Sequence, residues 1–205
     1  MRIIQLAFMC GALVVSTYFQ TGCVAMSSAN EKYYSLPANC DFTKLRGGDE
    51  VSNSCSPQLI DDNYRGIIIN GPKEVIWPKG ADIDNEPSPF GTTVGPVRLV
   101  IAASYKLPLT TLNIEADFNN QILFVAVNQV TKSVYSGRLP KFGISGPKPD
   151  SGTALANDPN RYNKGYINPD LVFICGLPIE NATYTIYATL GAYKSNVLTI
   201  KTIVK

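Results

Sequence analysis

The chain has 205 residues, 45% of them hydrophobic and 17% charged, with a formal net charge of +2. These fractions are typical of a globular domain and exclude a chain that is disordered throughout, and a nearly neutral chain without a basic run is a poor partner for nucleic acid. No histidine occurs, which excludes Ser-His-Asp and Cys-His catalysis and the commonest zinc and copper sites. We therefore expect a protein that is not an enzyme and needs no cofactor.

Apolar residues dominate the start of the chain. Arg2 precedes an apolar run from Ile3 to Phe19, which is long enough for the apolar region of a signal peptide. The run is marginal for a membrane span, which needs about 18 consecutive apolar residues, and no later run comes close to that length. We expect residues 1–22 to be a signal peptide, so that the mature chain is exported from the cytoplasm.

Thr21-Gly22-Cys23 follows the apolar run and resembles the lipobox of bacterial lipoproteins, in which the signal peptide is cut before a lipidated cysteine. The resemblance implies that Cys23 is the mature N-terminus and carries a lipid anchor, which places the protein at the outer membrane or in the periplasm. Acyl chains would supply a membrane affinity that nothing else in the chain offers. The alternative is an ordinary cleavage site at Cys23-Val24-Ala25 or Ser27-Ser28-Ala29, which gives a secreted protein.

Residues 23–63 are predicted to be a tether and an irregular extension, because proline, glycine and acidic residues interrupt every short apolar group. Export places Cys40, Cys55 and Cys175 in an oxidising compartment. We favour a disulfide between Cys40 and Cys55, since the intervening loop is short and closing it is worth about 3 kcal/mol in the chain-entropy model. Cys175 is then a buried thiol. A disulfide from Cys175 to either of the other two is the alternative.

Short β-type runs alternate with turn residues from Tyr64 onward, so residues 64–205 are predicted to form one domain. No amphipathic helix of convincing length occurs. Ile122 to Val127 is apolar at every position, which predicts a central strand. The predicted strands are 66–70, 74–77, 97–105, 112–117, 121–130, 134–139, 171–175, 183–190 and 196–204.

Two pairs of these runs are predicted to form hairpins. A polar tip near residues 129–133 separates the first pair, and residues 191–195 make the return between the last two runs. In 183–190 the residues of one face alternate with three threonines and Tyr187 on the other, as in an antiparallel strand that is buried on one face. The face predicted to be buried consists of Tyr184, Ile186, Ala188 and Leu190, joined in the last run by Leu198, Ile200 and Val204.

The segment Glu180-Asn181-Ala182-Thr183-Tyr184-Thr185-Ile186 resembles the start of strand F in immunoglobulin-like domains, where a tyrosine hydroxyl bonds back to the chain in a tyrosine corner. Ile186 stands where the inter-sheet cysteine of antibody domains occurs, so the resemblance keeps the sandwich and removes that disulfide. It implies an all-β fold: an immunoglobulin-like Greek-key β-sandwich with an irregular N-terminal extension. A small barrel is the competing fold.

Residues 140–170 are predicted to be a long connection, because glycine and proline recur through them, and connections longer than about 15 residues are usually functional or disordered. The second half combines Arg161, Tyr162, Asn163 and Tyr166. Flat rings can stack on a sugar, while amides and a guanidinium bond its hydroxyl groups, so these four residues are the predicted ligand-binding site for a glycan or a protein. The structural alternative is that the two tyrosines cover the open end of the sandwich core.

The function expected from these observations is a non-catalytic binding module of the cell envelope, or a secreted one, that recognises a glycan or an envelope protein through long loops. Contact with the membrane would come only through the lipid anchor. One alternative is a structural subunit of an envelope assembly that pairs through exposed strand edges. A second is a hydrolase that uses paired carboxylates.

Overall fold

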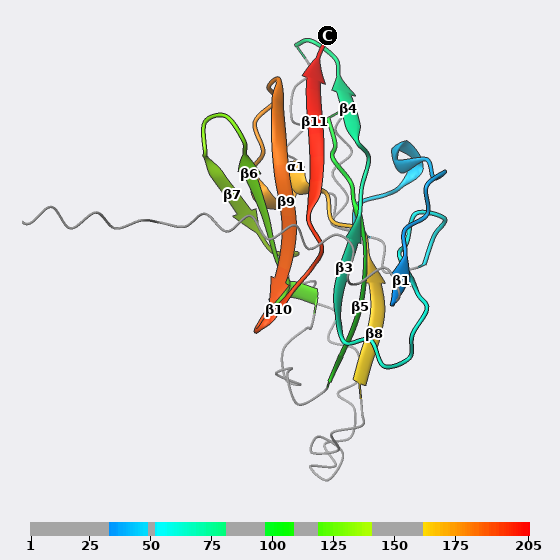
Figure 1. Ribbon diagram of the computed structural model, residues 1–205. Helices are drawn as coiled ribbons and strands as arrows, with labels where there is room; N and C mark the ends of the chain where they lie inside the picture. The colour runs from blue at the N-terminus through cyan, green and yellow to red at the C-terminus, as the bar shows by residue number, and fades with distance from the viewer. Residues whose placement is uncertain (1–32, 49–51, 81–96, 109–118, 141–161) are drawn as a thin grey trace, which may run out of the picture.

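The computed structural model describes residues 33–48, 52–80, 97–108, 119–140 and 162–205. The expected signal peptide, Cys23, Arg161 and the expected strand 112–117 lie outside these residues. The described part is almost entirely β-structure, with one short α-helix and two 3-10 turns. No helix in these five segments is long and apolar enough to cross a bilayer. The expected all-β fold is confirmed (Figure 1).

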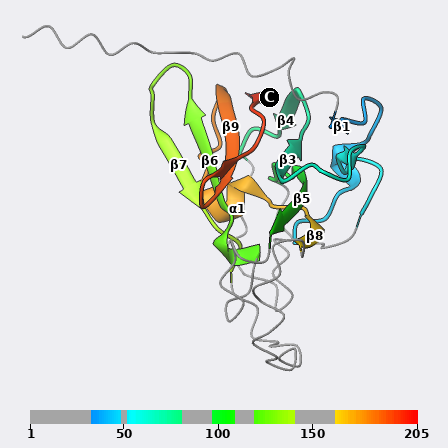
Figure 2. The ribbon, with the colours of Figure 1, turned by 60° about the horizontal axis from the view of Figure 1, so that its bottom comes forward.

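Nine of the described strands form two sheets that face each other (Figures 1 and 2). The first has three antiparallel strands in the order β3-β5-β8. The second has six strands, with β4-β11-β9-β6-β7 in order and β10 paired to β9, and its β4–β11 pair is parallel. Their bounds are β3 Gly66–Asn70, β4 Glu74–Trp77, β5 Ala102–Pro108, β6 Leu123–Asn128, β7 Val134–Gly137, β8 Tyr162–Ile167, β9 Ala182–Leu190, β10 Tyr193–Lys194 and β11 Leu198–Val204.

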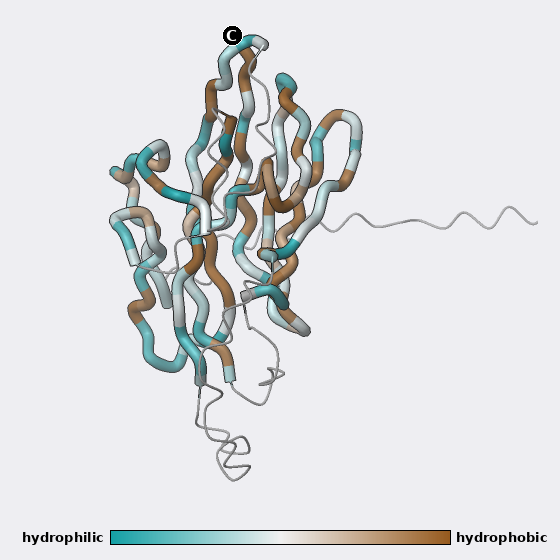
Figure 3. Tube along the Cα trace, turned by 180° about the vertical axis from the view of Figure 1, so that it is seen from behind, coloured by the Kyte–Doolittle hydropathy of each residue, from teal (hydrophilic) through white to brown (hydrophobic). Residues whose placement is uncertain are grey.

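A single apolar core fills the space between the two sheets, because alternate residues of strands from both sheets point into it. Figure 3 shows apolar residues recurring along these strands. Full burial of such a side chain stabilises the fold by about 1.5–3 kcal/mol. The largest fully buried members include Ile67, Ile69, Trp77, Leu107, Phe124, Ile167 and Tyr184.

Asn196, which follows β10, connects the two sheets through its side-chain amide. Its Oδ1 accepts a hydrogen bond from the Ile69 backbone N–H at 2.8 Å, and its Nδ2 donates to the Ile69 carbonyl at 2.9 Å. The amide thus satisfies both backbone groups of a residue in β3, as a neighbouring strand would.

The predicted strands agree best with the structure where one face of the strand packs into the core. β3 and β4 have the predicted bounds. Both hairpins are confirmed by antiparallel pairing, with Val127 opposite Val134 and Ile186 opposite Leu198. β6 lies between β9 and β7, which confirms the predicted central strand. The predicted inward face of β9 is buried, with no member more than 5% exposed.

Tyr184 shows how the tyrosine of the predicted corner is bound. Its hydroxyl donates a 2.9 Å hydrogen bond to the Glu180 Oε1 atom, which also accepts from Asn128 Nδ2 at 3.0 Å. The hydroxyl thus returns to a residue four positions upstream, through that residue's side chain. Burial, and then the nearby Glu180 carboxylate, raises the pKa of Tyr184. The fully buried ring therefore has its polar group satisfied.

Residues 171–175 were predicted to be a strand, and this prediction is wrong: they form α1 (Leu171–Cys175). Asp170 is the N-cap and its Oδ1 accepts from the Val172 N–H at 3.1 Å, while Gly176 ends the helix in the left-handed conformation at φ 64°. A carboxylate cap before the run and a glycine after it favour a helical turn. α1 buries Leu171, Val172 and Cys175 against the sandwich.

The second half of the expected long connection is also different, because β8 occupies residues 162–167. β8 pairs with β5 along its length, with Gly165 opposite Tyr105. A Cβ at Gly165 would overlap the Tyr105 hydroxyl, so the glycine leaves space for the ring. The first half, residues 141–161, lies outside the described residues.

The N-terminal extension covers the outer face of the three-stranded sheet, as Figure 2 shows. It contains little regular structure: β1 (Tyr34–Ser35) pairs with β2 (Gln58–Leu59), and a 3-10 turn spans Phe42–Lys44. Polar side chains of the sheet donate hydrogen bonds to its carbonyl groups. Asn70 bonds the carbonyls of Pro37 and Cys55, Ser104 that of Pro57, and Lys106 that of Asp62. β3 is consequently buried along its whole length.

Candidate ligand-binding surface

The alternation of β8 separates the predicted site residues onto two faces. Ile167 belongs to the core, so Asn163 shares the core side of the strand, while Tyr162 and Tyr166 lie on the outer side with Lys164. The structure therefore brings the two predicted tyrosines to one face and places Asn163 on the other. The structural alternative expected both tyrosines to cover the end of the core. Neither of them is a member of the core cluster. Arg161 directly precedes the described strand.

Cross-strand register fixes which side chains are neighbours on this outer face. Lys106 of β5 lies between Gly66 of β3 and Lys164 of β8. Directly paired residues of an antiparallel sheet have Cβ atoms about 4.5–5.5 Å apart. Two lysines are thus held side by side, and Tyr162 lies diagonally from Lys106, opposite Pro108.

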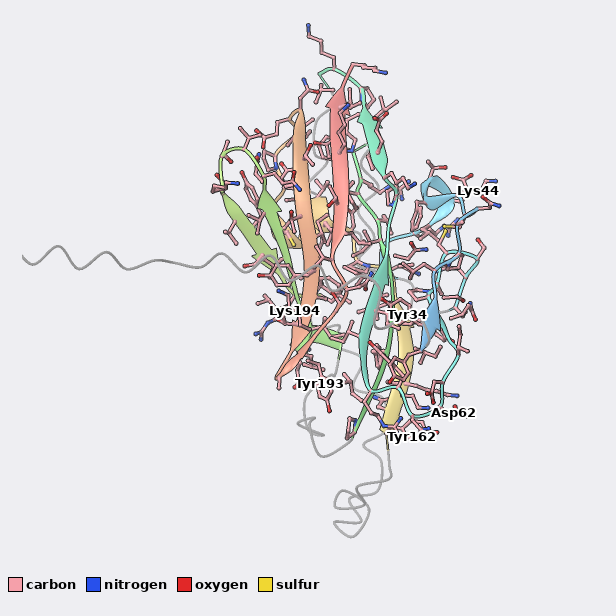
Figure 4. All side chains as sticks on the ribbon, viewed as in Figure 1. Tyr34, Lys44, Asp62, Tyr162, Tyr193 and Lys194 are labelled. Atoms are coloured by element: carbon pink, nitrogen blue, oxygen red, sulfur yellow. The ribbon has the colours of Figure 1, made fainter. Side chains whose placement is uncertain are left out.

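Two cations lie over the Tyr162 ring. The Lys106 Nζ atom is 4.3 Å and the Arg65 Cζ atom 4.8 Å from the ring centroid, both within the range of a cation–π interaction. The side chain is nevertheless 41% exposed. Figure 4 shows Tyr162 beside Asp62 at the end of the sandwich where β8 begins. We call this area the Tyr162 surface and define it by Asp62, Tyr64, Arg65, Lys106, Tyr162, Lys164 and Tyr166.

Lys106 fixes the geometry of the Tyr162 surface. Its side chain is 4% exposed, and its Nζ donates to the Asp62 carbonyl and lies 3.3 Å from the Asp62 Oδ1 atom. Burying an ammonium group is costly unless it is paired and hydrogen-bonded, so these contacts hold the side chain in one position. The same contacts tie the end of the extension to the sheet.

Tyr64 packs over Gly66, the residue of β3 that pairs with Lys106. A Cβ at Gly66 would lie 2.6 Å from the Tyr64 hydroxyl, so the ring packs over a position where only glycine fits. The Tyr33 and Tyr34 rings contact Tyr64 with centroid distances of 6.2 and 6.1 Å. Burial, with a smaller effect of Tyr34, raises the pKa of Tyr64 to about 12. Its hydroxyl therefore stays protonated and donates to the Ile67 carbonyl at 3.2 Å.

Several polar groups of the Tyr162 surface remain available to a ligand. The Arg65 Nη1 group donates to the carbonyls of Asp62 and Tyr64 at 2.7 and 2.8 Å, whereas Nε and Nη2 make no hydrogen bond with the described residues. Lys164 is exposed and forms no ion pair within the described segments. Sequence reasoning missed Arg65 and Lys106, because only the strand register reveals that they are neighbours of Tyr162.

A cleft of about 720 Å³ opens between the extension and the sandwich, away from the Tyr162 surface. Its walls include Pro37, Cys40 and Phe42 on one side and Pro72 and Leu198 on the other. Asp41 is the one carboxylate among the described lining residues, and its pKa is lowered chiefly by the hydrogen bond from the Thr43 hydroxyl. The paired carboxylates of a hydrolase therefore do not come together among the residues that line this cleft.

The three cysteines of the described chain are thiols, so the predicted disulfide between Cys40 and Cys55 is not formed in this structure. The two residues are nevertheless neighbours, packed with Leu45 and Val100. Burial, followed by the contact with Cys40, raises the pKa of the Cys55 thiol to about 12. Cys175 is buried elsewhere, with its Sγ atom 3.7 Å from the Phe124 carbonyl, and burial raises its pKa to about 12 as well.

No known protein family model matches the sequence, and no curated protein is similar to it at a significant level.

Proposed function

We propose that this protein is an exported, non-catalytic binding module that recognises a glycan through the Tyr162 surface. The observation that carries the proposal is the Tyr162 ring, which is 41% exposed yet held by two cations on a strand that is paired along its length. A pre-positioned ring offers an apolar platform to the C–H face of a sugar at little cost in conformational entropy. The neighbouring cationic donors supply hydrogen bonds to its hydroxyl groups.

The test is binding of the mature protein to a glycan array, comparing wild type with Tyr162→Ala. Tyr187→Ala is the matched control, because Tyr187 in β9 also carries a lysine over its ring, with Lys194 Nζ 4.2 Å from the centroid. Loss of binding in Tyr162→Ala alone supports the proposal. Equal binding by all three proteins removes the Tyr162 surface from consideration.

We also propose that the sandwich is immunoglobulin-like. Support comes from the strand order, since β3-β5-β8 facing β11-β9-β6-β7 follows the A-B-E and G-F-C-C′ arrangement of such domains. The Tyr184 to Glu180 hydrogen bond at the start of β9 is a second argument for it. The proposal includes export, with Cys23 as the lipidated N-terminus in the periplasm or at the outer membrane, or secretion if an ordinary site is cleaved.

A structural role in an envelope assembly is the second candidate, and a specific observation favours it. β4 and β7 are the last strands on either side of the six-stranded sheet as described, and they expose Ile76 at 54% and Val134 at 64%. Apolar residues at a sheet edge favour pairing with another chain. Crosslinking in intact envelopes tests this candidate, and a protein that stays monomeric and links to nothing contradicts it.

A further inference from the structure

We propose that the ligand of the Tyr162 surface is an acidic glycan, one whose sugars carry carboxylate groups. This inference rests on the proposed function and adds the chemical class of the ligand. It begins from the charges around the ring. Arg65, Lys106 and Lys164 surround Tyr162, whereas Asp62 is the one carboxylate in direct contact with them among the described residues.

Lys106 contributes a positive potential to this surface, because the Asp62 carboxylate neutralises its charge only in part. The ammonium is buried, but its partner Asp62 is a fully solvent-exposed side chain. Water screens an exposed carboxylate strongly, and the interaction of two charges grows as the surrounding dielectric constant falls. An approaching anion that displaces water from the ring therefore meets the charge of Lys106 together with that of Arg65.

The free donors are arranged for a carboxylate. Arg65 has Nε and Nη2 without a partner in the described chain, and these two groups form the planar fork that binds a carboxylate with two parallel hydrogen bonds. Lys164 lies on the same face, two residues from Tyr162, and offers a mobile point charge. A neutral sugar could stack on the Tyr162 ring, but it would offer no negative charge to Arg65 or Lys164.

The shape of the surface favours a chain of sugars over a small free anion. Tyr162 and Tyr166 lie on the outer face of β8 with Lys164 between them. Alternate residues of a strand are about 6.6 Å apart, so one strand presents ring, cation and ring in a row. Tyr162 and Lys164 are exposed and Tyr166 is partly buried, so a polymer with a carboxylate on each sugar can contact the first two along the strand.

The experiment uses polygalacturonate as the probe and its fully methyl-esterified form as the matched neutral polymer, measured by calorimetry with the mature protein. Lys164→Gln and Arg65→Gln test the charges. Lys194→Gln is the control, because it removes an exposed lysine beside a tyrosine on the other sheet. We expect binding to polygalacturonate that weakens about tenfold in each of the two test variants, weakens with added salt, and is unchanged in the control.

The possible results separate this inference from the function on which it rests. Equal binding of both polymers, insensitive to the charge variants but lost in Tyr162→Ala, overturns the acidic ligand and leaves glycan binding standing. Equal weakening by Lys194→Gln and Lys164→Gln indicates non-specific attraction and overturns the inference. No binding to either polymer or to any array glycan overturns both proposals.

Discussion

The Lys106 ammonium lies 4.3 Å from the centroid of the Tyr162 ring and bonds the Asp62 carbonyl at the same time. One side chain of β5 thereby joins the extension, the sheet and the candidate binding residue. The binding surface and the attachment of the extension are thus parts of one arrangement. A change that loosens the extension is expected to move the ring as well.

Lys106→Met removes the ammonium and keeps most of the aliphatic length. We expect a loss of about 1–3 kcal/mol in the free energy of unfolding, because the carbonyl of Asp62 loses its buried donor. Urea denaturation measures it. Lys164→Met is the control, since this exposed cross-strand neighbour has no partner in the described chain, and its effect should stay within about 0.5 kcal/mol. Equal losses in both variants contradict the role given to Lys106.

Gly137 in β7 is expected to tolerate no side chain. A Cβ there would overlap the carbonyl oxygen of Ile174 in α1. Gly137→Ala should therefore push α1 away from the sheet and destabilise the protein by about 1–3 kcal/mol, as overpacking does. Thermal unfolding measures the change, with Ser136→Ala at the neighbouring exposed position as control. A Gly137→Ala protein as stable as wild type would show that α1 is not packed so closely.

Asp170 is expected to give the fold a specific pH dependence. Burial raises its pKa above the ordinary 3.8, although hydrogen bonds from Leu99 and Val172 oppose the shift. The folded state then binds a proton more tightly than the unfolded state, so stability falls as pH rises from about 3.8 through the raised pKa. Above that pKa the full penalty of the buried charge is present.

Asp170→Asn keeps an oxygen to accept both backbone hydrogen bonds and cannot ionise. The difference in unfolding free energy between variant and wild type should therefore shift in favour of the variant as pH rises from 4 towards neutral. Urea denaturation at a series of pH values measures this difference. A constant difference across the series would mean that Asp170 titrates normally.

In the oxidising compartment that the proposed export implies, Cys40 and Cys55 are expected to form a disulfide. Their side chains are already neighbours, and a thiol–disulfide exchange with an oxidising partner converts the two thiols to one disulfide and reduces the partner by two electrons. Peptide mapping after alkylation should find the 40–55 link, with Cys175 alkylated only after unfolding. Cys175→Ala should leave the link intact. A link that includes Cys175 contradicts the pairing.

Cys23 is expected to carry the lipid anchor. Cells fed a fatty-acid analogue should label the wild-type protein, and Cys23→Ser should abolish both the label and retention with the membrane fraction. Cys40→Ser serves as the control for loss of a different cysteine. An unlabelled wild-type protein released from the cell would support cleavage at an ordinary signal-peptidase site.

Sequence patterns predicted the elements that have one face in the core. The alternation in β9 indicated its buried face, because each inward residue meets the opposite sheet. The five-residue run at 171–175 was misassigned, since a short apolar run does not distinguish a strand from a helical turn. The caps Asp170 and Gly176 were the signal that could have identified the helix.

The candidate site was predictable only in part. Tyr162 and Tyr166 were predicted as aromatic binding residues in a polar segment, but that segment did not look like a strand, because two of its three core-facing positions are Asn163 and Gly165 and only Ile167 is apolar. Arg65 and Lys106 lie far from them in sequence. Their meeting depends on the pairing of β3, β5 and β8, which residue patterns do not encode.

The bond between Asn196 and Ile69 spans 127 positions of the chain. Contacts of such long range form late and slow the search for the native state, because the entropy of closing the loop is lost before the contact contributes. During synthesis, a chain that has not yet reached Asn196 therefore cannot form this contact between the two sheets. Such a delay would suit the export proposed above, in which the polypeptide passes a secretion channel before it folds.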